Sequence, residues 1–298
     1  MSEEERRHWP QSRRFEFIEW KLLWEGQLNR SDLENTFDIS TPQASVDLKQ
    51  YREIAGENIA YNGTEKAFIP KREIQPRFLT VSADRLLLQL RALLTGALTP
   101  RDLWFRQIPS VAMAPDIARH VDPACLRRIL HALRTRTAID VRYQSLTNSR
   151  RRTIAPHALA FDGYRWHVRA WACDRGDFRD FVLSRIDELG ETHTVDFDPN
   201  DDVEWNSKII LELVPHPGLT TEQSRAIQRD FSMQEGKREI ETRLSMAYYF
   251  ITRMNLDLTD LSPERVQIYL RNLTEVLAAI KGAKAETQKR IAARNKSV

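Results

Sequence analysis

Cysteine is scarce in this sequence, and long hydrophobic segments are absent. The two cysteines, Cys125 and Cys173, lie far apart and form neither a Cys-x-x-Cys pair nor the disulfide framework of a small secreted protein. The N-terminal residues are charged and lack the apolar core of a signal peptide, and apolar stretches such as 86–88 are interrupted within one helical turn. These absences predict a cytoplasmic protein without a membrane segment.

Signatures of catalysis and metal binding are missing as well. The sequence has no Gly-rich phosphate loop, no His-Glu-x-x-His, no paired cysteines and no Gly-x-Ser-x-Gly. His157 and His167 can meet on neighbouring strands, but no carboxylate with metal-ligand spacing accompanies them. Asp198, Asp201 and Asp202 are interpreted as a loop that connects two domains. We therefore expect no enzymatic activity, no cofactor and no metal.

The composition is that of a folded protein with several parts. The chain has 298 residues, of which 41% are hydrophobic and 29% are charged. Its patterns divide it into four segments: residues 1–78, 79–120, 121–195 and 205–298. Helices and strands occur in separate groups, so the predicted fold class is α+β and multidomain.

Lysine is missing from residues 73–207, where arginine is the only strong cation. The planar guanidinium group suits bidentate contact with phosphate or carboxylate. Residues 120–190 contain 13 Arg against 8 Asp and Glu, whereas residues 1–75 contain 11 Lys and Arg against 14 Asp and Glu. The central segment is therefore better suited to an anion than the first one. An arginine-biased genome is the alternative explanation.

The first segment shows three helical patterns followed by a hairpin. Apolar residues recur at helical spacing in three groups: Phe15, Ile18 and Leu22, then Leu33 and Phe37, then Ala44, Leu48 and Tyr51. Thr41 is the expected N-cap of the third helix, with Pro42 at its first position. Asn62 and Gly63 predict a two-residue hairpin turn between strands near 59–62 and 66–69.

This order of elements indicates a winged helix-turn-helix over residues 1–78. The third helix fits the major groove, where Gln reads adenine edges and Ser, Thr and Lys hold phosphates. The predicted DNA-binding residues are Ser40, Thr41, Gln43, Ser45, Lys49, Gln50, Tyr61 and Lys66. A small helical protein-binding module remains the alternative, since the segment has no basic excess.

The second segment, residues 79–120, is predicted to be a helical linker. Ser82 can cap a helix with a wide apolar stripe at Leu86, Leu87, Leu90, Leu93 and Leu94. Such a helix favours packing or dimerisation, and a dimer would present two recognition helices to two half-sites.

The third segment begins with a helix near Asp122 and continues as strands. Ile139, Val141 and Tyr143 alternate with polar residues, which predicts a half-buried strand. A loop at 145–151, a strand at 154–159 with Pro156 near its end or edge, a strand near 166–170 and a fourth strand at 178–186 follow. Short bent strands with one helix suggest a small barrel.

Four blocks of this segment resemble a WYL domain. They are Val-Arg-Tyr-Gln-Ser at 141–145, Arg-Thr-Ile-Ala-Pro-His at 152–157, Gly-Tyr-Arg-Trp-His-Val-Arg-Ala at 163–170 and Phe-Val-Leu-Ser-Arg-Ile at 181–186. The tripeptide that names the domain stands here as Trp166, His167 and Val168. The whole chain resembles WYL-domain transcription regulators of the BrxR and CapW type, which repress bacterial phage-defence operons.

The resemblance implies an Sm-like small β-barrel at 121–195 that senses a nucleotide or nucleic-acid ligand. The ligand-binding residues it implies are Tyr143, Ser145, Arg152, His157, Trp166, His167, Phe181, Ser184 and Arg185. These residue types suit such a ligand, because an arginine guanidinium group can donate two hydrogen bonds to one phosphate and exposed aromatic rings stack on bases. The alternation around Trp166 and Phe181 favours core burial instead, and the run of arginines at 150–152 can be a solvated loop.

Residues 205–298 resemble the small α+β C-terminal extension of these regulators, which the resemblance associates with dimer contacts. We expect a strand at 209–214, a helix from Thr220, a strand near 238–244, a helix over 246–254, and a last helix at 263–281 with a frayed basic tail. Taken together, these features predict a homodimeric repressor that binds double-stranded DNA at an inverted repeat. The alternative is a protein that binds RNA or single strands through the barrel.

Overall fold

The computed structural model describes residues 3–115, 117, 119–294 and 296. The chain folds as two compact units, residues 1–117 and 118–298. Within the described residues, none of the helices is long and apolar enough to cross a membrane. The mixed helix and sheet architecture confirms the predicted α+β, multidomain fold class.

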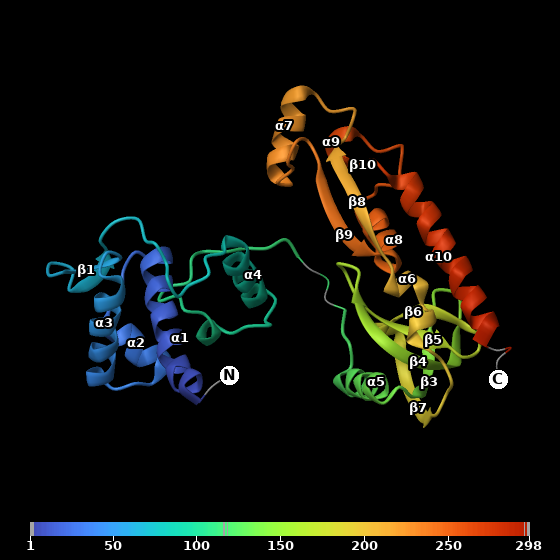
Figure 1. The fold of residues 1–298 in the computed structure, drawn as a ribbon, viewed down its shortest axis with the longest axis horizontal. Helices are drawn as coiled ribbons and strands as arrows, with labels where there is room; N and C mark the ends of the chain where they lie inside the picture. Colours follow the sequence, from blue (N-terminus) through green and yellow to red (C-terminus); the bar gives the residue numbers. More distant parts are fainter. Residues whose placement is uncertain (1–2, 116, 118, 295, 297–298) are drawn as a thin grey trace. The chain divides into compact units, whose positions relative to one another are not determined.

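The N-terminal unit contains a three-helix core and a two-stranded wing (Figure 1). Its elements are α1 (Glu3–Trp24), α2 (Arg30–Phe37), α3 (Thr41–Ala55), β1 (Ile59–Asn62), β2 (Ala67–Pro70), α4 (Ala83–Leu94) and the 3-10 turn η1 (Pro100–Asp102). The apolar positions predicted for the three helices are buried together except for Phe37, which is partly buried; Ile18, Leu33 and Tyr51 are each 0% exposed. Helical periodicity therefore identified this core correctly.

Two local predictions in this unit are wrong. Ser40, not Thr41, caps α3, because its hydroxyl accepts a hydrogen bond from the Gln43 N–H at 3.4 Å. The wing turn has four residues rather than two, since Asn62 pairs with Ala67. The Asn62 side chain instead accepts from two backbone N–H groups in the loop, at 3.0 and 3.3 Å, and Lys66 takes the positive φ.

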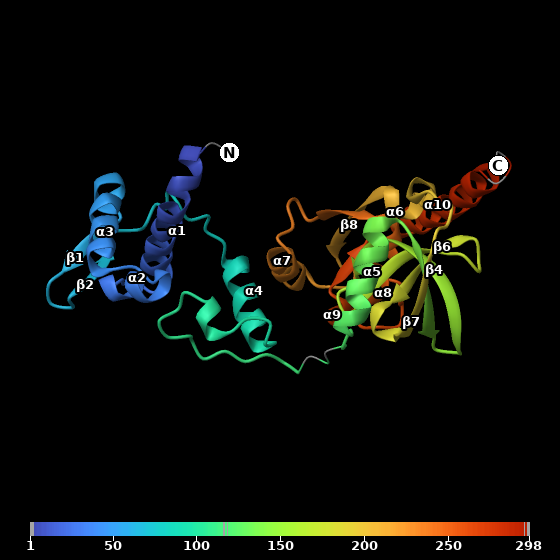
Figure 2. The ribbon, with the colours of Figure 1, turned by 90° about the horizontal axis from the view of Figure 1, so that it is seen from below.

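In the second unit, α5 (Pro123–Thr135) packs against a five-stranded antiparallel sheet in the order β6-β5-β4-β3-β7 (Figure 2). The strands are β3 (Ala138–Gln144), β4 (Ser149–Phe161), β5 (Trp166–Ala172), β6 (Asp177–Val182) and β7 (Ile186–His193), with the 3-10 turn η2 (Leu183–Arg185) between the last two. The core includes Ile129, Val141, Ile154 and Val168. As predicted, Val141 and Tyr143 face this core.

Strand boundaries in this sheet differ from the sequence prediction. The loop after β3 is shorter than expected, and the three arginines at 150–152 belong to β4. Pro156 lies inside β4, not at its end or edge, and a register shift between Pro156 and Ala158 accommodates its missing N–H. The predicted fourth strand ends at Val182, after which η2 separates it from a fifth strand.

The rest of this unit carries a three-stranded sheet in the order β10-β8-β9. Its elements are the 3-10 turn η3 (Pro199–Asp201), α6 (Val203–Asn206), β8 (Lys208–Pro215), α7 (Thr221–Asp230), β9 (Arg238–Arg243), α8 (Leu244–Arg253), α9 (Pro263–Val266), β10 (Ile268–Leu270) and α10 (Leu273–Arg294). Helix α10 runs from this sheet to the five-stranded one, where Ile291 packs beside Trp171 (Figure 1).

The single last helix expected at 263–281 is wrong. Gln267 adopts φ 66° and ends α9, and the next three residues pair with β8 as a strand. The helix that follows continues to Arg294, so the predicted fraying after 281 is also wrong. The burial of this segment follows the period of a strand, because β10 buries Ile268 and Leu270, two residues apart, and leaves Tyr269 between them exposed.

Candidate functional site

Helix α3 and the wing expose part of the predicted DNA-binding set. Ser40, Thr41, Lys49 and Lys66 are exposed, and Tyr61 is 55% exposed on β1 with its ring against Phe68. The Ser45 hydroxyl donates to the Thr41 carbonyl at 2.8 Å, which holds the first turn of the helix. The arrangement places cations and hydroxyls on one exposed helix and its adjoining hairpin.

The two glutamines of that set are held by hydrogen bonds, Gln43 within α3 and Gln50 from α1. Gln43 donates to Asp47 at 3.2 Å, and the Gln50 carbonyl oxygen accepts from Gln11. Asp47 is fully buried and also accepts from Arg14 at 2.6 Å. The Gln50 amide is thereby oriented by α1, and the Gln43 amide by Asp47 of its own helix, which Arg14 of α1 holds in turn.

Sequence reasoning missed two cations beside this face. Arg52 and Lys71 are exposed and, with Lys49 and Tyr61, line a groove of about 510 Å³ between α3 and β1. Arg52 lies three residues after Lys49, so helical spacing was a signal that could have found it. Lys71 follows β2, and only the fold brings it to the groove.

A buried carboxylate fastens α3 to the segment that leads to α4. Glu19 is fully buried in α1 and accepts from the backbone N–H groups of Arg77, Phe78 and Leu79 at 2.7–2.8 Å. It also accepts from the Tyr51 hydroxyl of α3 at 3.2 Å. Burial, followed by weaker effects of the neighbouring acids, raises the pKa of Tyr51 far above its usual value, so the hydroxyl stays a donor.

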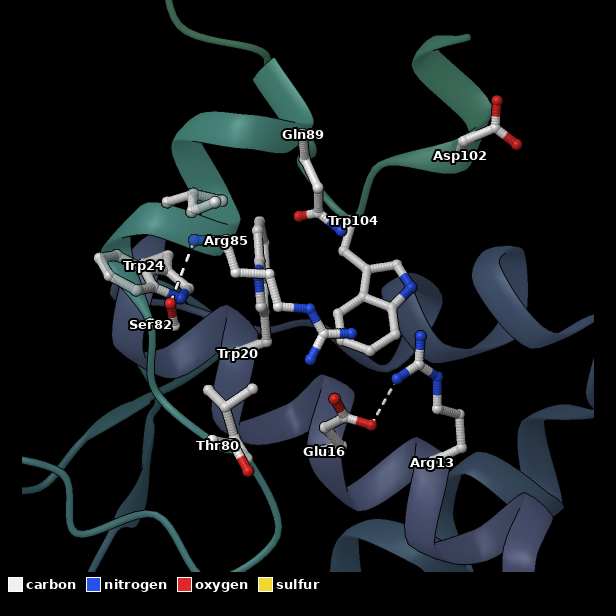
Figure 3. A pocket seen from close by; sticks show the side chains of 12 residues that line it. Arg13, Glu16, Trp20, Trp24, Thr80, Ser82, Arg85, Gln89, Asp102 and Trp104 are labelled. Carbon is white, nitrogen blue, oxygen red and sulfur yellow. Dashed lines mark hydrogen bonds and ion pairs between the residues drawn. The ribbon is translucent and has the colours of Figure 1, made fainter. Parts of the chain in front are cut away.

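Tryptophan residues line a small pocket between α1 and α4 (Figure 3). The Trp20 ring of α1 lies 6.0 Å from the Trp104 ring, Trp24 lines the far side of the pocket, and Arg85 and Gln89 of α4 reach over them. The Arg13 guanidinium lies 4.2 Å from the Trp104 ring centroid and pairs with Glu16. The pocket is nearly filled by these side chains, which makes it a packed joint between the winged helix and α4.

On the five-stranded sheet, Tyr143, Arg152 and Phe181 of the predicted ligand set come together. The Tyr143 and Phe181 rings meet edge to face at 5.2 Å, and the Arg152 guanidinium lies 5.9 Å from the Phe181 centroid. Arg150 lies beside them, because residues two apart in a strand share a face, and Arg150, Arg152 and core residue Ile154 all lie on one face of β4. Arg150 and Arg152 are called the arginine pair below.

The other predicted ligand residues lie elsewhere. His157 and His167 are directed toward the opposite face, where they bond to Asp202 at 2.9 Å and Asp162 at 2.8 Å. Ser145 closes the β3–β4 turn by accepting from the N–H groups of residues 147 and 148. Ser184 is exposed and Arg185 half-buried, both in η2.

The expectation of core burial holds for one of the two aromatic residues to which it applied. Phe181 is 3% exposed, in the core. Trp166 is 49% exposed, so its predicted burial is wrong. It begins β5 next to the turn after β4, where its ring packs on Phe161 at 5.1 Å instead of on the core.

Comparison with known proteins matches the whole architecture. Residues 10–92 match the BrxR transcriptional regulator winged helix-turn-helix domain, residues 124–190 the WYL domain, and residues 208–276 the BrxR transcriptional regulator C-terminal dimerization domain. The chain is 37% identical over 281 residues to the DNA-binding transcriptional repressor CapW of Escherichia coli strain KTE188, with 92% of this chain and 93% of that protein covered.

The chain belongs to the CapW and BrxR family of transcriptional repressors.

Other relatives agree with this assignment. CapW of Stenotrophomonas maltophilia is 37% identical over 273 residues, covering 90% of this chain and 91% of that protein. Among solved structures, the proteasome accessory factor B/C of Arthrobacter aurescens aligns at 18% identity over 91% of this chain and 46% of that chain. Its TM-score is 0.29, so this likeness adds nothing to the family assignment.

In this CapW-type chain, a buried cluster joins the WYL sheet to the C-terminal region. Arg169 of β5 donates to Asp202 at 2.8 and 2.9 Å, and to Asp180 and Glu204 at 3.2 Å each. Asp202 is fully buried and also bonds to His157. Asp202 lies in the segment interpreted from the sequence as a connecting loop, between η3 and α6, and its carboxylate anchors that segment to the sheet.

Electrostatics in this cluster follow from burial and pairing. Burial alone raises the pKa of Asp202, but hydrogen bonds from Arg169 and His157 outweigh it and lower that pKa to about 2. For Glu204 burial dominates, and its pKa is raised.

The spacing of Arg169 between apolar residues of one strand was the only sequence signal for a buried charge here. Within the described residues, no group of His, Cys, Asp and Glu is arranged to hold a metal ion.

Proposed function

We propose that this protein is a homodimeric transcriptional repressor that binds an inverted-repeat operator and responds to a nucleotide or nucleic-acid fragment at its WYL domain. The observation that carries the proposal is the 37% identity to CapW over 92% of the chain, in a protein whose winged helix exposes cations on α3. Domain limits of 1–78, 79–120, 121–195 and 205–298 are part of the proposal.

Dimerisation is supported by exposed apolar residues of α4 as well as by the matched dimerization domain. On α4, Leu87 is 61% and Leu88 63% exposed, although Leu90 of the same helix is buried. Exposed leucines of this kind are costly in water and are typical of an interface. A two-fold pair of winged helices would then bind two half-sites in inverted repeat.

Lys49 tests the DNA interface. Replacing Lys49 with alanine is expected to weaken binding to the upstream region of the protein's own gene by roughly tenfold, because one phosphate contact is lost. The slope of log affinity against log salt concentration should become shallower by about one. The measurement is fluorescence anisotropy over a series of salt concentrations. Gln43→Ala should also weaken binding.

Lys208→Ala is the matched control, because Lys208 is an exposed lysine that pairs with Glu241 in the C-terminal region. Its operator affinity should equal that of the wild type. An unchanged affinity for Lys49→Ala would show that α3 does not contact the operator.

Arg185 tests the sensor. We expect Arg185→Ala to bind the operator normally but to lose its response to the inducing ligand, since the ligand must favour one state of the dimer over another. A promoter-reporter strain measures both properties. Arg152→Ala should behave in the same way. Equal loss of repression and response would mean that these arginines hold the fold instead.

One comparison separates this function from single-strand binding through the barrel. Tight binding to the upstream duplex, with weak binding to random single strands, supports the repressor. The reverse preference supports the alternative. We further propose that the regulated genes form a phage-defence operon. Their position beside the gene for this protein on the chromosome would support that assignment.

A further inference from the structure

The arginine pair has fewer acceptors than its donors require. The Nε atoms of Arg150 and Arg152 are both buried and have no hydrogen-bond partner among the residues that the structure describes. Buried donors are nearly always paired in native proteins, so an unpaired guanidinium nitrogen indicates an acceptor that binds there. Two such atoms on neighbouring side chains indicate a single ligand with several oxygens.

One carboxylate of the chain already reaches this position. Asp174 lies in the turn between β5 and β6, and its Oδ2 atom is 3.0 Å from Arg152 Nη1 and 3.8 Å from Arg150 Nη2. The same oxygen lies 4.0 Å from Arg175 Nε. A single carboxylate therefore stands among three guanidinium groups. It satisfies one of them at hydrogen-bond distance.

The local charge balance is positive. Arg179 in β6 is neutralised by its bidentate pair with Asp177 at 2.8 Å, so among the described carboxylates it is Asp174 that faces the other three arginines. Burial, which outweighs the attraction of Asp174, lowers the pKa of Arg152, and the neighbouring arginines lower it further. An incoming anion would relieve this repulsion.

We propose that Asp174 is a built-in occupant of an anion site formed by the arginine pair, and that a terminal phosphate monoester displaces it. A phosphate monoester carries about −1.5 to −2 charges and three acceptor oxygens, which matches several guanidinium groups better than a phosphodiester does. The Phe181 ring beneath Arg152 keeps the guanidinium in place. This inference rests on the proposed sensing function and specifies its ligand as a phosphorylated nucleotide or nucleic-acid end.

Calorimetry on the full-length protein tests the site. The probes are a short oligothymidylate with a 5′-phosphate, the same oligomer with a 5′-hydroxyl, and inorganic phosphate. The wild type should bind the phosphorylated oligomer about tenfold more tightly than the hydroxyl form. Asp174→Asn removes the competing carboxylate, and should bind the phosphorylated oligomer and inorganic phosphate about tenfold more tightly than the wild type does.

Glu188→Gln is the matched control. It removes one negative charge from the same sheet, beside Arg142 and Arg151. Its affinities should equal those of the wild type. Equal affinity of the wild type for the two oligomers overturns the proposal. So does an Asp174→Asn variant that binds no more tightly than Glu188→Gln.

Thermal denaturation covers the case in which Asp174→Asn folds less well. The variant leaves the arginine pair without its carboxylate, so its melting temperature should fall, and inorganic phosphate should restore it. Phosphate should not raise the melting temperature of Glu188→Gln. Failure of phosphate to restore Asp174→Asn contradicts the anion site.

The inference and the proposed function can fail separately. If oligomers weaken operator binding whatever their 5′ group, the proposed sensing function holds and the phosphate site is contradicted. If phosphorylated oligomers bind as expected but do not change operator affinity, the phosphate site holds and the proposed sensing function is contradicted.

Discussion

Glu19→Ala is expected to lower the free energy of unfolding of the N-terminal unit by about 3 to 5 kcal/mol, because three backbone N–H groups and the Tyr51 hydroxyl lose the fully buried carboxylate that accepts from them. Those groups belong to residues 77–79, and the same carboxylate also accepts from Tyr51 of α3. Urea denaturation, followed by tryptophan fluorescence, measures the change. Trp20, Trp24 and Trp104 all lie in this unit and report on it.

The loss should extend to DNA binding, because the recognition helix is tied to the linker through this carboxylate. Glu16→Ala is the matched control. It lies three residues earlier in α1, where its carboxylate pairs with the exposed Arg13, and a surface pair contributes at most about 1 kcal/mol. Similar destabilisation by the two substitutions would show that Glu19 contributes no more than a surface charge.

Asp202→Asn should destabilise the second unit by about 3 kcal/mol or more at neutral pH, because Arg169 loses the carboxylate with which it forms two hydrogen bonds. The pKa of Asp202 in the folded protein is about 2, below its ordinary value near 3.9. A lowered carboxyl pKa stabilises the fold above the ordinary value. That stabilisation is lost as the pH falls through the folded value.

The difference between the wild type and Asp202→Asn should therefore be constant above about pH 5 and shrink by about 2 kcal/mol between pH 4 and pH 2. Urea denaturation at a series of pH values measures it. Asp196→Asn removes an exposed aspartate earlier in the same connection and should leave the free energy of unfolding within about 0.5 kcal/mol of the wild type at neutral pH. A difference for Asp202→Asn that does not change with pH would contradict the lowered pKa.

Predictions from local periodicity were the most successful. Ile18, Leu33, Tyr51 and Val141 are buried as their spacing required, because the period of a helix or strand shows which face meets the core. Boundaries were less certain. Ser40 and Thr41 are adjacent and both suit an N-cap, so the sequence pattern did not decide between them, and only the backbone geometry did.

For the candidate sites, too, local sequence patterns predicted the residue types and the fold decided which residues meet. Residue type and block order predicted a winged helix, a WYL domain and arginines suited to phosphate. They did not predict that His157 and His167 would bond to Asp202 and Asp162 across the sheet from the arginine pair. Nor did they predict Glu19 as the acceptor for a segment 58 to 60 residues away.

The amino-acid sequence by itself determined the modules, their order and their chemical character, because amphipathic periods and characteristic blocks are properties of neighbouring residues. The tertiary structure alone decided which charges neutralise one another and which donors remain unpaired. Arg169 and Asp202 are 33 residues apart in the chain, and their pairing depends on distance in space and on removal from water, neither of which the order of residues records.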